Sequence, residues 1–160
     1  MIDLPPVTIA RAIVMRDGKL AVHKRLANGF QYYSLPGGHI ESEEAPEHAV
    51  VREVDEELSL TVTVERVLYC YISEEWGNQL IYLCSYQSGK LGLRADSEEA
   101  ADTRRGKNTY QPQWLELSQI EEVNILPAPV KTRLLADLAA EQFASEVVKL
   151  YDTPQEEAYA

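Results

Sequence analysis

Residues 37–60 read GGHIESEEAPEHAVVREVDEELSL, and this stretch decides how the rest of the chain is interpreted. It begins with a glycine pair and an acidic segment, and it continues with the spacing of an amphipathic helix. We predict that the helix begins near Ala45 or Pro46, because the first turn of a helix has no use for the N–H that proline lacks. At 100° per residue one face of the helix is an apolar stripe. The stripe consists of Val50, Val51, Val54 and Leu58.

A second face of this helix carries three carboxylates, from Glu53, Glu56 and Glu57. Side chains three and four positions apart are neighbours on a helix, so these like charges repel one another unless a cation neutralises them. Hard cations with oxygen ligands do so. Without cysteine or histidine in the cluster, the pattern favours Mg²⁺, with Mn²⁺ as the alternative, over zinc. Two glycines just before the helix let the backbone turn sharply and come close, so a carbonyl can join the ligands.

A plainer interpretation of the same residues stands beside this one, since most acidic helix faces are only solvated. For the segment REVDEEL alone, the two interpretations have about equal weight.

The size and charge of the chain limit its partners. At 160 residues it is expected to form one domain, predicted over residues 1–151 with a flexible tail at 152–160. The formal net charge of −11 disfavours a nucleic acid polymer. A small phosphate ester is compatible with it, because divalent cations reverse the local sign of a carboxylate cluster.

Membrane and export signals are not seen in the sequence. No apolar run approaches the roughly 18 residues that span a bilayer, and the first residues lack the pattern of a signal peptide. Cys70 and Cys84 lie in strand-like runs. We expect both to be reduced core residues of a cytoplasmic protein.

Outside residues 37–60, alternating apolar residues predict a sheet followed by helices. The predicted strands are 7–15, 19–25, 31–35, 61–72, 79–87 and 110–117. Asp17-Gly18 predicts a hairpin turn, Ser118 the N-cap of a short helix, and residues 129–143 a longer helix. Residues 90–109 are polar and are expected to form a long functional or mobile loop.

The positions of the charged residues match a known motif. Gly38, Glu44, Arg52-Glu53 and Glu56-Glu57 fit the spacing G-x5-E-x7-R-E-U-x-E-E-x-G-U, where U is a bulky aliphatic residue. Eight of the nine defined positions agree, and Ser59 stands where glycine is usual. The chain therefore resembles the Nudix hydrolase family, of the MutT-like kind. Because that glycine normally ends the helix in a left-handed conformation, Ser59 is expected to have a small stability cost.

The resemblance implies an α/β/α sandwich with a mixed central sheet. It also implies Mg²⁺-dependent attack of water on a nucleoside diphosphate linked to another group, X. The metal ligands implied are Gly38, Glu53, Glu56 and Glu57. Glu53 and Glu57 would be catalytic, and Glu53 is our choice of base, although the family varies in this role. Glu44 and Arg52 would form a structural ion pair.

Further candidates lie outside the motif. Family members draw another acidic ligand from a later loop, where Glu98 and Glu99 are candidates and Glu98 is our choice. The alternative for each is a solvated loop acid. The substrate-binding candidates are Arg11, Arg25, Tyr33, Asn108 and Tyr110, and their alternatives are edge-strand arginines and core aromatics. His23, His39 and His48 have no ligand spacing and are expected at the surface or in turns.

The substrate is less well defined by the sequence. The proline that marks many ADP-ribose hydrolases shortly after the motif is missing, since the first proline after Leu60 is Pro112. This favours a nucleoside triphosphate or a related small nucleotide. The alternatives are a non-catalytic nucleotide sensor on the same fold and an interaction module whose acidic helix is only solvated. A homodimer is left open.

Overall fold

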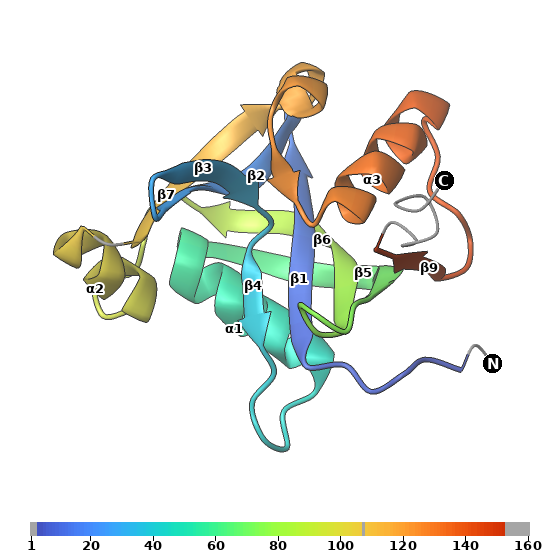
Figure 1. Ribbon diagram of the computed structural model, residues 1–160, viewed down its shortest axis with the longest axis horizontal. Coiled ribbons are helices and arrows are strands. Elements are labelled where there is room, and N and C mark those ends of the chain that lie inside the picture. Colours follow the sequence, from blue (N-terminus) through green and yellow to red (C-terminus); the bar gives the residue numbers. More distant parts are fainter. Residues whose placement is uncertain (1–2, 107, 153–160) are drawn as a thin grey trace.

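The computed structural model describes residues 3–106 and 108–152 of the chain. Its strands are β1 (Ile9–Arg16), β2 (Lys19–Ala27), β3 (Phe30–Ser34), β4 (Gly37–His39), β5 (Leu60–Ile72), β6 (Gln79–Gly89), β7 (Asn108–Glu116), β8 (Ile125–Leu126) and β9 (Val148–Tyr151). Its helices are α1 (Pro46–Leu58), α2 (Glu98–Arg105), α3 (Ala128–Ala140) and the short 3₁₀ helix η1 (Leu117–Glu122). Figure 1 shows their arrangement.

The strands form one mixed, strongly curled sheet in the order β8-β3-β2-β1-β6-β5-β9, with β4 added beside β1 and β7 beside β2. The hairpin of β1 and β2 joins only at Met15–Leu20 and Arg16–Lys19. Beyond that end β1 pairs with β4 and β6, while β2 pairs with β3 and β7 (Figure 1). The two halves of the sheet therefore diverge, and the acidic side chains of α1 lie where they part.

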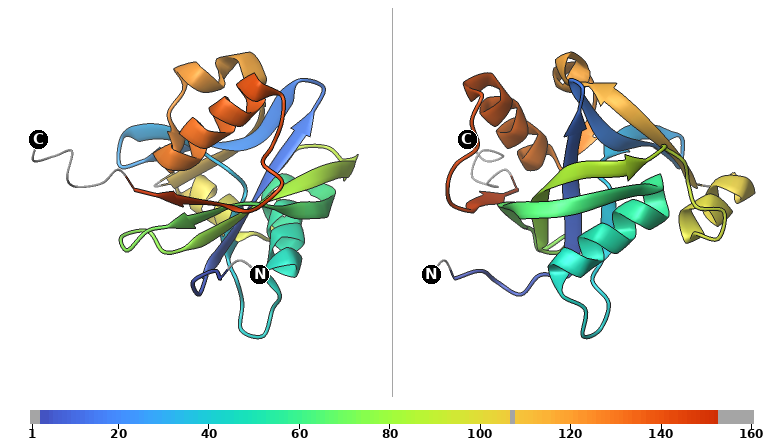
Figure 2. Two further views of the ribbon diagram at one scale, coloured as in Figure 1. Left: turned by 90° about the vertical axis from the view of Figure 1, so that its right-hand side faces the viewer. Right: turned by 180° about the vertical axis from the view of Figure 1, so that it is seen from behind.

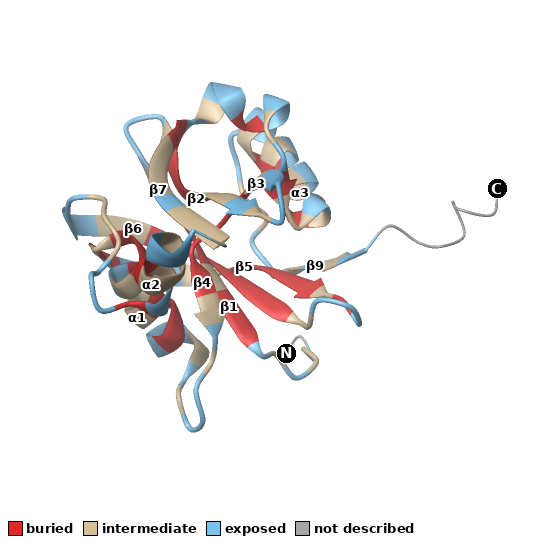
Figure 3. Ribbon diagram, turned by 60° about the vertical axis from the view of Figure 1, so that its left-hand side comes forward, coloured by how far each residue is buried: buried red, intermediate tan, exposed pale blue. Residues whose placement is uncertain are grey.

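Alternate residues of β1 serve two different cores. Ala10, Ala12 and Val14 are buried against the apolar stripe of α1, and their small side chains let that helix approach closely. Ile13 points to the other side, into a core shared with α3. Helices α1 and α3 thus cover opposite faces of the sheet, and the buried residues gather along the strands between them (Figures 2 and 3). This confirms the predicted α/β/α sandwich with a mixed sheet.

Helix α1 begins and ends where the sequence indicates. Ala45 is the N-cap and Pro46 the first helical residue. Ser59 ends the helix in the left-handed conformation, with φ 58°. Its Oγ donates a hydrogen bond to the carbonyl oxygen of Gly92 at 2.7 Å. A net hydrogen bond contributes about 1 kcal/mol, which offsets much of the cost of a non-glycine residue at this φ.

The prediction of a loop over residues 90–109 is wrong, because α2 lies inside it. Ser97 caps the helix, its Oγ accepting a hydrogen bond from the Ala100 N–H at 3.1 Å. Glu98 and Glu99 occupy the first turn, basic residues the last turn, and Gly106 ends it at φ 77°. These charges complement the helix dipole. The helix therefore has its own local stabilisation, in addition to packing beside β7.

Two smaller predictions near the C-terminus also need correction. Ser118 is not an N-cap, because η1 begins at Leu117 and has no side-chain cap. Asp152, placed in the predicted flexible tail, accepts hydrogen bonds from the hydroxyls of Tyr71 and Ser73. These two hydrogen bonds extend the contact between β9 and β5 by one residue beyond the end of β9. The rest of the predicted tail, residues 153–160, lies outside the described residues.

Cys70 and Cys84 are free and buried, as the sequence predicts. Within the described ranges, no helix combines the length and apolar character needed to cross a membrane.

Candidate active site

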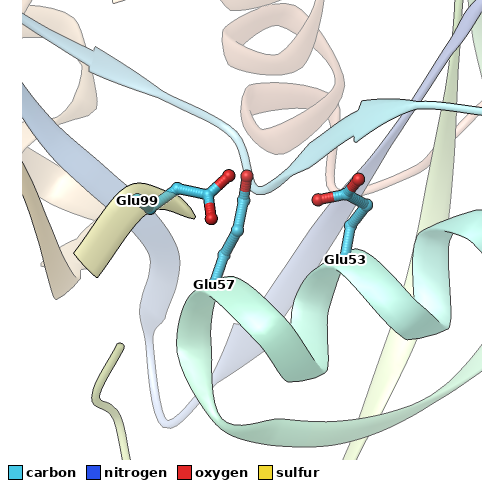
Figure 4. Close-up of side chains that lie close together, drawn as sticks. All are labelled: Glu53, Glu57 and Glu99. Carbon is cyan, nitrogen blue, oxygen red and sulfur yellow. The ribbon is translucent and has the colours of Figure 1, made fainter. Parts of the chain in front are cut away.

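Three carboxylates converge at the point where the sheet divides. Glu53 and Glu57 project from successive turns of α1, and both are buried. Glu99 reaches them from α2 and is half-buried. One oxygen from each of the three lies within 4.8 Å of the others. Figure 4 shows Glu57 and Glu99 turned toward one another, with Glu53 one turn before Glu57 on α1.

The glycine pair holds two of these side chains by close backbone contact. The Gly37 N–H donates a hydrogen bond to Oε2 of Glu57 at 2.9 Å. A Cβ at position 38 would lie only 2.7 Å from Oε1 of Glu53, so the absence of a side chain at Gly38 makes room for this carboxylate. The sequence of a glycine turn followed by a helix therefore fixes the Glu53 and Glu57 carboxylates in space.

Arg52 ties the acidic loop to α1. Its Nε and Nη2 donate to the two carboxylate oxygens of Glu44, both at 2.8 Å. These hydrogen bonds lower the pKa of Glu44 to about 2. Nη1 of Arg52 also donates to Glu53 at 3.0 Å and reaches Glu56 at 3.5 Å. The bidentate geometry of the Arg52–Glu44 pair gives it both orientation and strength.

The carboxylates of the site are only partly neutralised by the protein. Burial, and after it the negative charge of Glu57, raises the pKa of Glu53 to about 7. Burial also raises the pKa of Glu99, and the charge of Glu57 adds to this. Both shifts mean that the folded chain disfavours the ionised acids in the absence of a cation. Three buried or half-buried oxygen donors in this state fit a hard divalent cation such as Mg²⁺ or Mn²⁺.

The raised pKa of Glu53 predicts how the metal-free protein responds to pH. Because the folded state holds a proton that the unfolded chain releases near pH 4.5, the contribution of Glu53 to stability should be greatest below that pH and be lost as pH rises to about 7. We expect the melting temperature in EDTA to drop by several degrees between these pH values. Differential scanning calorimetry of wild type and Glu53→Gln tests this, since the glutamine should flatten the dependence. An equally steep fall in Glu53→Gln would contradict the assignment, and Glu98→Gln is the surface control.

The structure separates the predicted metal ligands. Glu53 and Glu57 belong to the cluster, whereas Glu56 is half-buried, beside Arg52 and outside it. The choice of Glu98 is wrong in position: it is exposed on α2, and the next residue, Glu99, turns inward. Adjacent residues of a helix point about 100° apart, so only one of the two can face α1. The carbonyl of Gly38 remains a predicted ligand.

Three of the five substrate candidates, Arg11, Arg25 and Tyr110, lie near the cluster, and Asn108 lies further out on the face that carries Tyr110. Arg11 donates to Gln79 at 2.8 Å and to the Leu35 carbonyl at 3.0 Å, and the charges of Glu53 and Glu57 act on it. Arg25 lies over the Tyr110 ring, its Cζ 3.7 Å from the centroid. Asn108 is two positions from Tyr110 on β7, on the same face.

Tyr33 is the candidate that the structure contradicts. It is buried in the core beneath α3, together with Val22 of the neighbouring strand. The physical reason is the period of two in a strand. Tyr33 pairs with Lys24, so it lies on the face opposite to Arg25 and Tyr32.

The sequence predicts His23 at the surface or in a turn, and the structure corrects this, since the residue is buried within β2. Its side chain is only 1% exposed, and its Nε2 lies 3.4 Å from Oε2 of Glu57. Its ring meets the Tyr110 ring edge-on at 5.7 Å. The signal was available in the sequence, because His23 and Arg25 are alternate residues of one strand and must share a face.

Comparison with known proteins defines the family. The family model described as "NUDIX domain" matches residues 6–137. The chain belongs to this family. The match includes β1 to β8, α1 and the whole of α2, so it extends far beyond the Nudix motif of residues 38–60.

Two curated Nudix relatives and one solved structure show the range of similarity. A Methanocaldococcus jannaschii protein named "ADP-ribose pyrophosphatase" is 32% identical over 103 residues, 61% of each chain. A "MutT-like protein" of Streptomyces ambofaciens is 36% identical over 99 residues, 61% of this chain and 62% of its own. The chain thus matches about three-fifths of the length of these relatives. A crystal structure described as an ADP-ribose pyrophosphatase of Streptococcus suis has a TM-score of 0.64 and 20% identity, covering 92% of this chain and all of its own, which supports the fold.

Proposed function

We propose that this Nudix protein is a Mg²⁺-dependent hydrolase that cleaves the diphosphate bond of a nucleoside diphosphate linked to another group, X. Mn²⁺ is the alternative metal. The observation that carries the proposal is the convergence of the carboxylates of Glu53, Glu57 and Glu99 within 4.8 Å. Such a site suits water attack at phosphorus, because this chemistry depends on positioning and on neutralising phosphate charge.

The carboxylates would divide the work between them. All three would hold the cation, which when bound neutralises phosphate charge and acidifies water. Glu53 is our candidate base, because its buried carboxylate belongs to the cluster that would hold the attacking water. Glu57 is oriented by the Gly37 N–H, which donates a hydrogen bond to its Oε2 at 2.9 Å.

Two arginines would bind the substrate phosphates. The charges of Glu57 and Glu53 act on Arg11, and Arg25 lies near enough to Arg11 for the two guanidinium charges to interact. Guanidinium groups bind phosphate by two parallel hydrogen bonds. A cytoplasmic location, and a small nucleotide rather than a nucleic acid polymer as partner, stay predictions from the sequence, which leaves a homodimer open.

A phosphate-release screen with Mg²⁺ and Mn²⁺ tests the proposal. The substrates should include nucleoside triphosphates, oxidised nucleotides, nucleotide sugars, dinucleoside polyphosphates and ADP-ribose, the last because of the name of one relative. We expect hydrolysis of at least one group and none in EDTA. Tight nucleotide binding without hydrolysis of any substrate would overturn the proposal in favour of a sensor.

The position of Glu99 leads to a separate prediction. Glu99→Gln should weaken Mg²⁺ or Mn²⁺ binding by about tenfold or more, because it removes one of three converging charges. Glu98→Gln removes the same charge from the exposed side of the same helix and should leave the affinity unchanged. Isothermal titration calorimetry measures both. If both substitutions weakened metal binding equally, the affinity would depend on the total charge of α2 and not on the position of Glu99.

A further inference from the structure

The face of β2 that carries His23 is built in three rows with its neighbours β3 and β7. In the first row His23 lies between Ser34 and Pro112, and in the second Arg25 lies between Tyr32 and Tyr110. In the outer row Ala27 lies between Phe30 and Asn108. Alternate residues of a strand share a face, so all three rows line one surface that starts at the acidic cluster.

The first row touches the proposed metal site through the 3.4 Å approach of His23 to Glu57. Two residues of a strand advance about 7 Å, so the outer row lies about 13 Å from the first. A ribose with its 5′-phosphates fits this interval. The part of a nucleotide that would reach the outer row is therefore its base.

The second row supplies a cation between aromatic rings. Arg25 lies with Cζ 3.7 Å from the Tyr110 centroid and 5.4 Å from that of Tyr32. Its buried Nε has no hydrogen-bond partner among residues 3–106 and 108–152. The rings hold the guanidinium by cation–π contact, which leaves its N–H groups for an anionic ligand.

The outer row has the chemistry that binds a planar heteroaromatic ring. Phe30 is 55% exposed and stacks on Tyr32 at 6.0 Å and 28°. Ala27 puts only a methyl group between Phe30 and Asn108. The amide of Asn108 offers one donor group and one acceptor, the pair that complements the N6 and N7 edge of adenine.

We propose that the outer row of Phe30, Ala27 and Asn108 binds the nucleobase of the substrate and selects adenine. This rests on the proposed function, because the acidic cluster must hold the phosphates. Phe30 stacks on the base, and Asn108 reads its edge. This narrows the proposed substrates from nucleoside diphosphates in general to adenosine diphosphate linked to a group X.

Binding of AMP, UMP and ribose 5-phosphate in the presence of Mg²⁺, measured by calorimetry, tests this inference. Wild type should bind AMP about tenfold more tightly than the other two ligands. Phe30→Ala should weaken AMP about tenfold or more, since a stacked base contributes that much, and leave ribose 5-phosphate unchanged. Asn108→Leu should bring AMP and UMP to similar affinity.

Leu26→Ala is the matched control, because Leu26 is 45% exposed in the same hairpin but on the opposite face. It should change none of the three affinities. Three results would overturn the base site. Phe30→Ala could bind AMP as tightly as wild type does, or it could lose as much affinity for ribose 5-phosphate as for AMP. Wild type could also prefer UMP to AMP. If Phe30→Ala hydrolyses its substrate as fast as wild type does, the proposed function is supported and the base site is not. Phe30-dependent AMP binding without hydrolysis of any substrate would support the base site alone.

Discussion

Replacing Glu53 or Glu57 by glutamine is expected to lower the rate of diphosphate cleavage by about two to four orders of magnitude while the fold persists. Each substitution removes a buried negative charge from the cluster, and Glu53→Gln also removes the proposed base. Glutamine has nearly the same shape, and at position 57 its carbonyl oxygen can still accept the hydrogen bond from Gly37. Steady-state kinetics with the best substrate from the phosphate-release screen measures the loss.

Glu98→Gln is again the control for this experiment, since it changes the net charge equally but lies on the exposed side of α2. Its turnover should match wild type. Circular dichroism and the melting temperature establish that the glutamine variants are folded. The assignment of this cluster as the active site would be wrong if Glu53→Gln and Glu57→Gln both cleaved every active substrate at the wild-type rate.

The second large effect is expected at the glycine pair, where two neighbouring substitutions should act in different ways. A Cβ on Gly37 would lie 2.2 Å from the carbonyl oxygen of Ala10 and 2.6 Å from Cα of Arg11. Both are backbone atoms of β1, the partner of β4, so the pairing must open. We expect Gly37→Ala to lower the free energy of unfolding by more than about 3 kcal/mol.

Gly38→Ala should keep the fold and damage the site. Its Cβ would meet the end of the Glu53 side chain at 2.7 Å, and a flexible carboxylate can move away at little cost. Stability should change by about 1 kcal/mol or less, while metal affinity and turnover fall. Urea denaturation and metal titration of the two variants check the contrast. A stable Gly37→Ala protein, or unchanged metal affinity in Gly38→Ala, would show that the close approach is not what holds these groups.

Much of the acidic site was predictable because it depends on local geometry. Helical spacing alone places Glu53 and Glu57 one turn apart on the same side of α1, and the structure brings both into the cluster. The glycine pair next to the helix likewise limits where the backbone turns. The Glu44–Arg52 pair follows from the same segment, since its partners are eight residues apart.

Helix α2 was missed although its local signals are present. Ser97, the two acids after it, the basic last turn and Gly106 are the pattern of a short capped helix. The polar composition of residues 90–109 concealed this, because α2 buries only Ala100 fully. In this helix the side chains of Glu98 and Glu99 point about 100° apart, so only Glu99 faces α1.

The sequence by itself determined the family, the acidic helix and the glycines that hold it, because these depend on neighbours within about 20 residues. Only the tertiary structure decided which acid of α2 completes the cluster, that His23 is buried beside Glu57, and that Tyr33 belongs to the core. The reason is strand register. A shift of one residue turns every side chain of a strand to the other face. Register between β2, β3 and β7 is set by packing across the whole sheet, so no short stretch of the chain contains it.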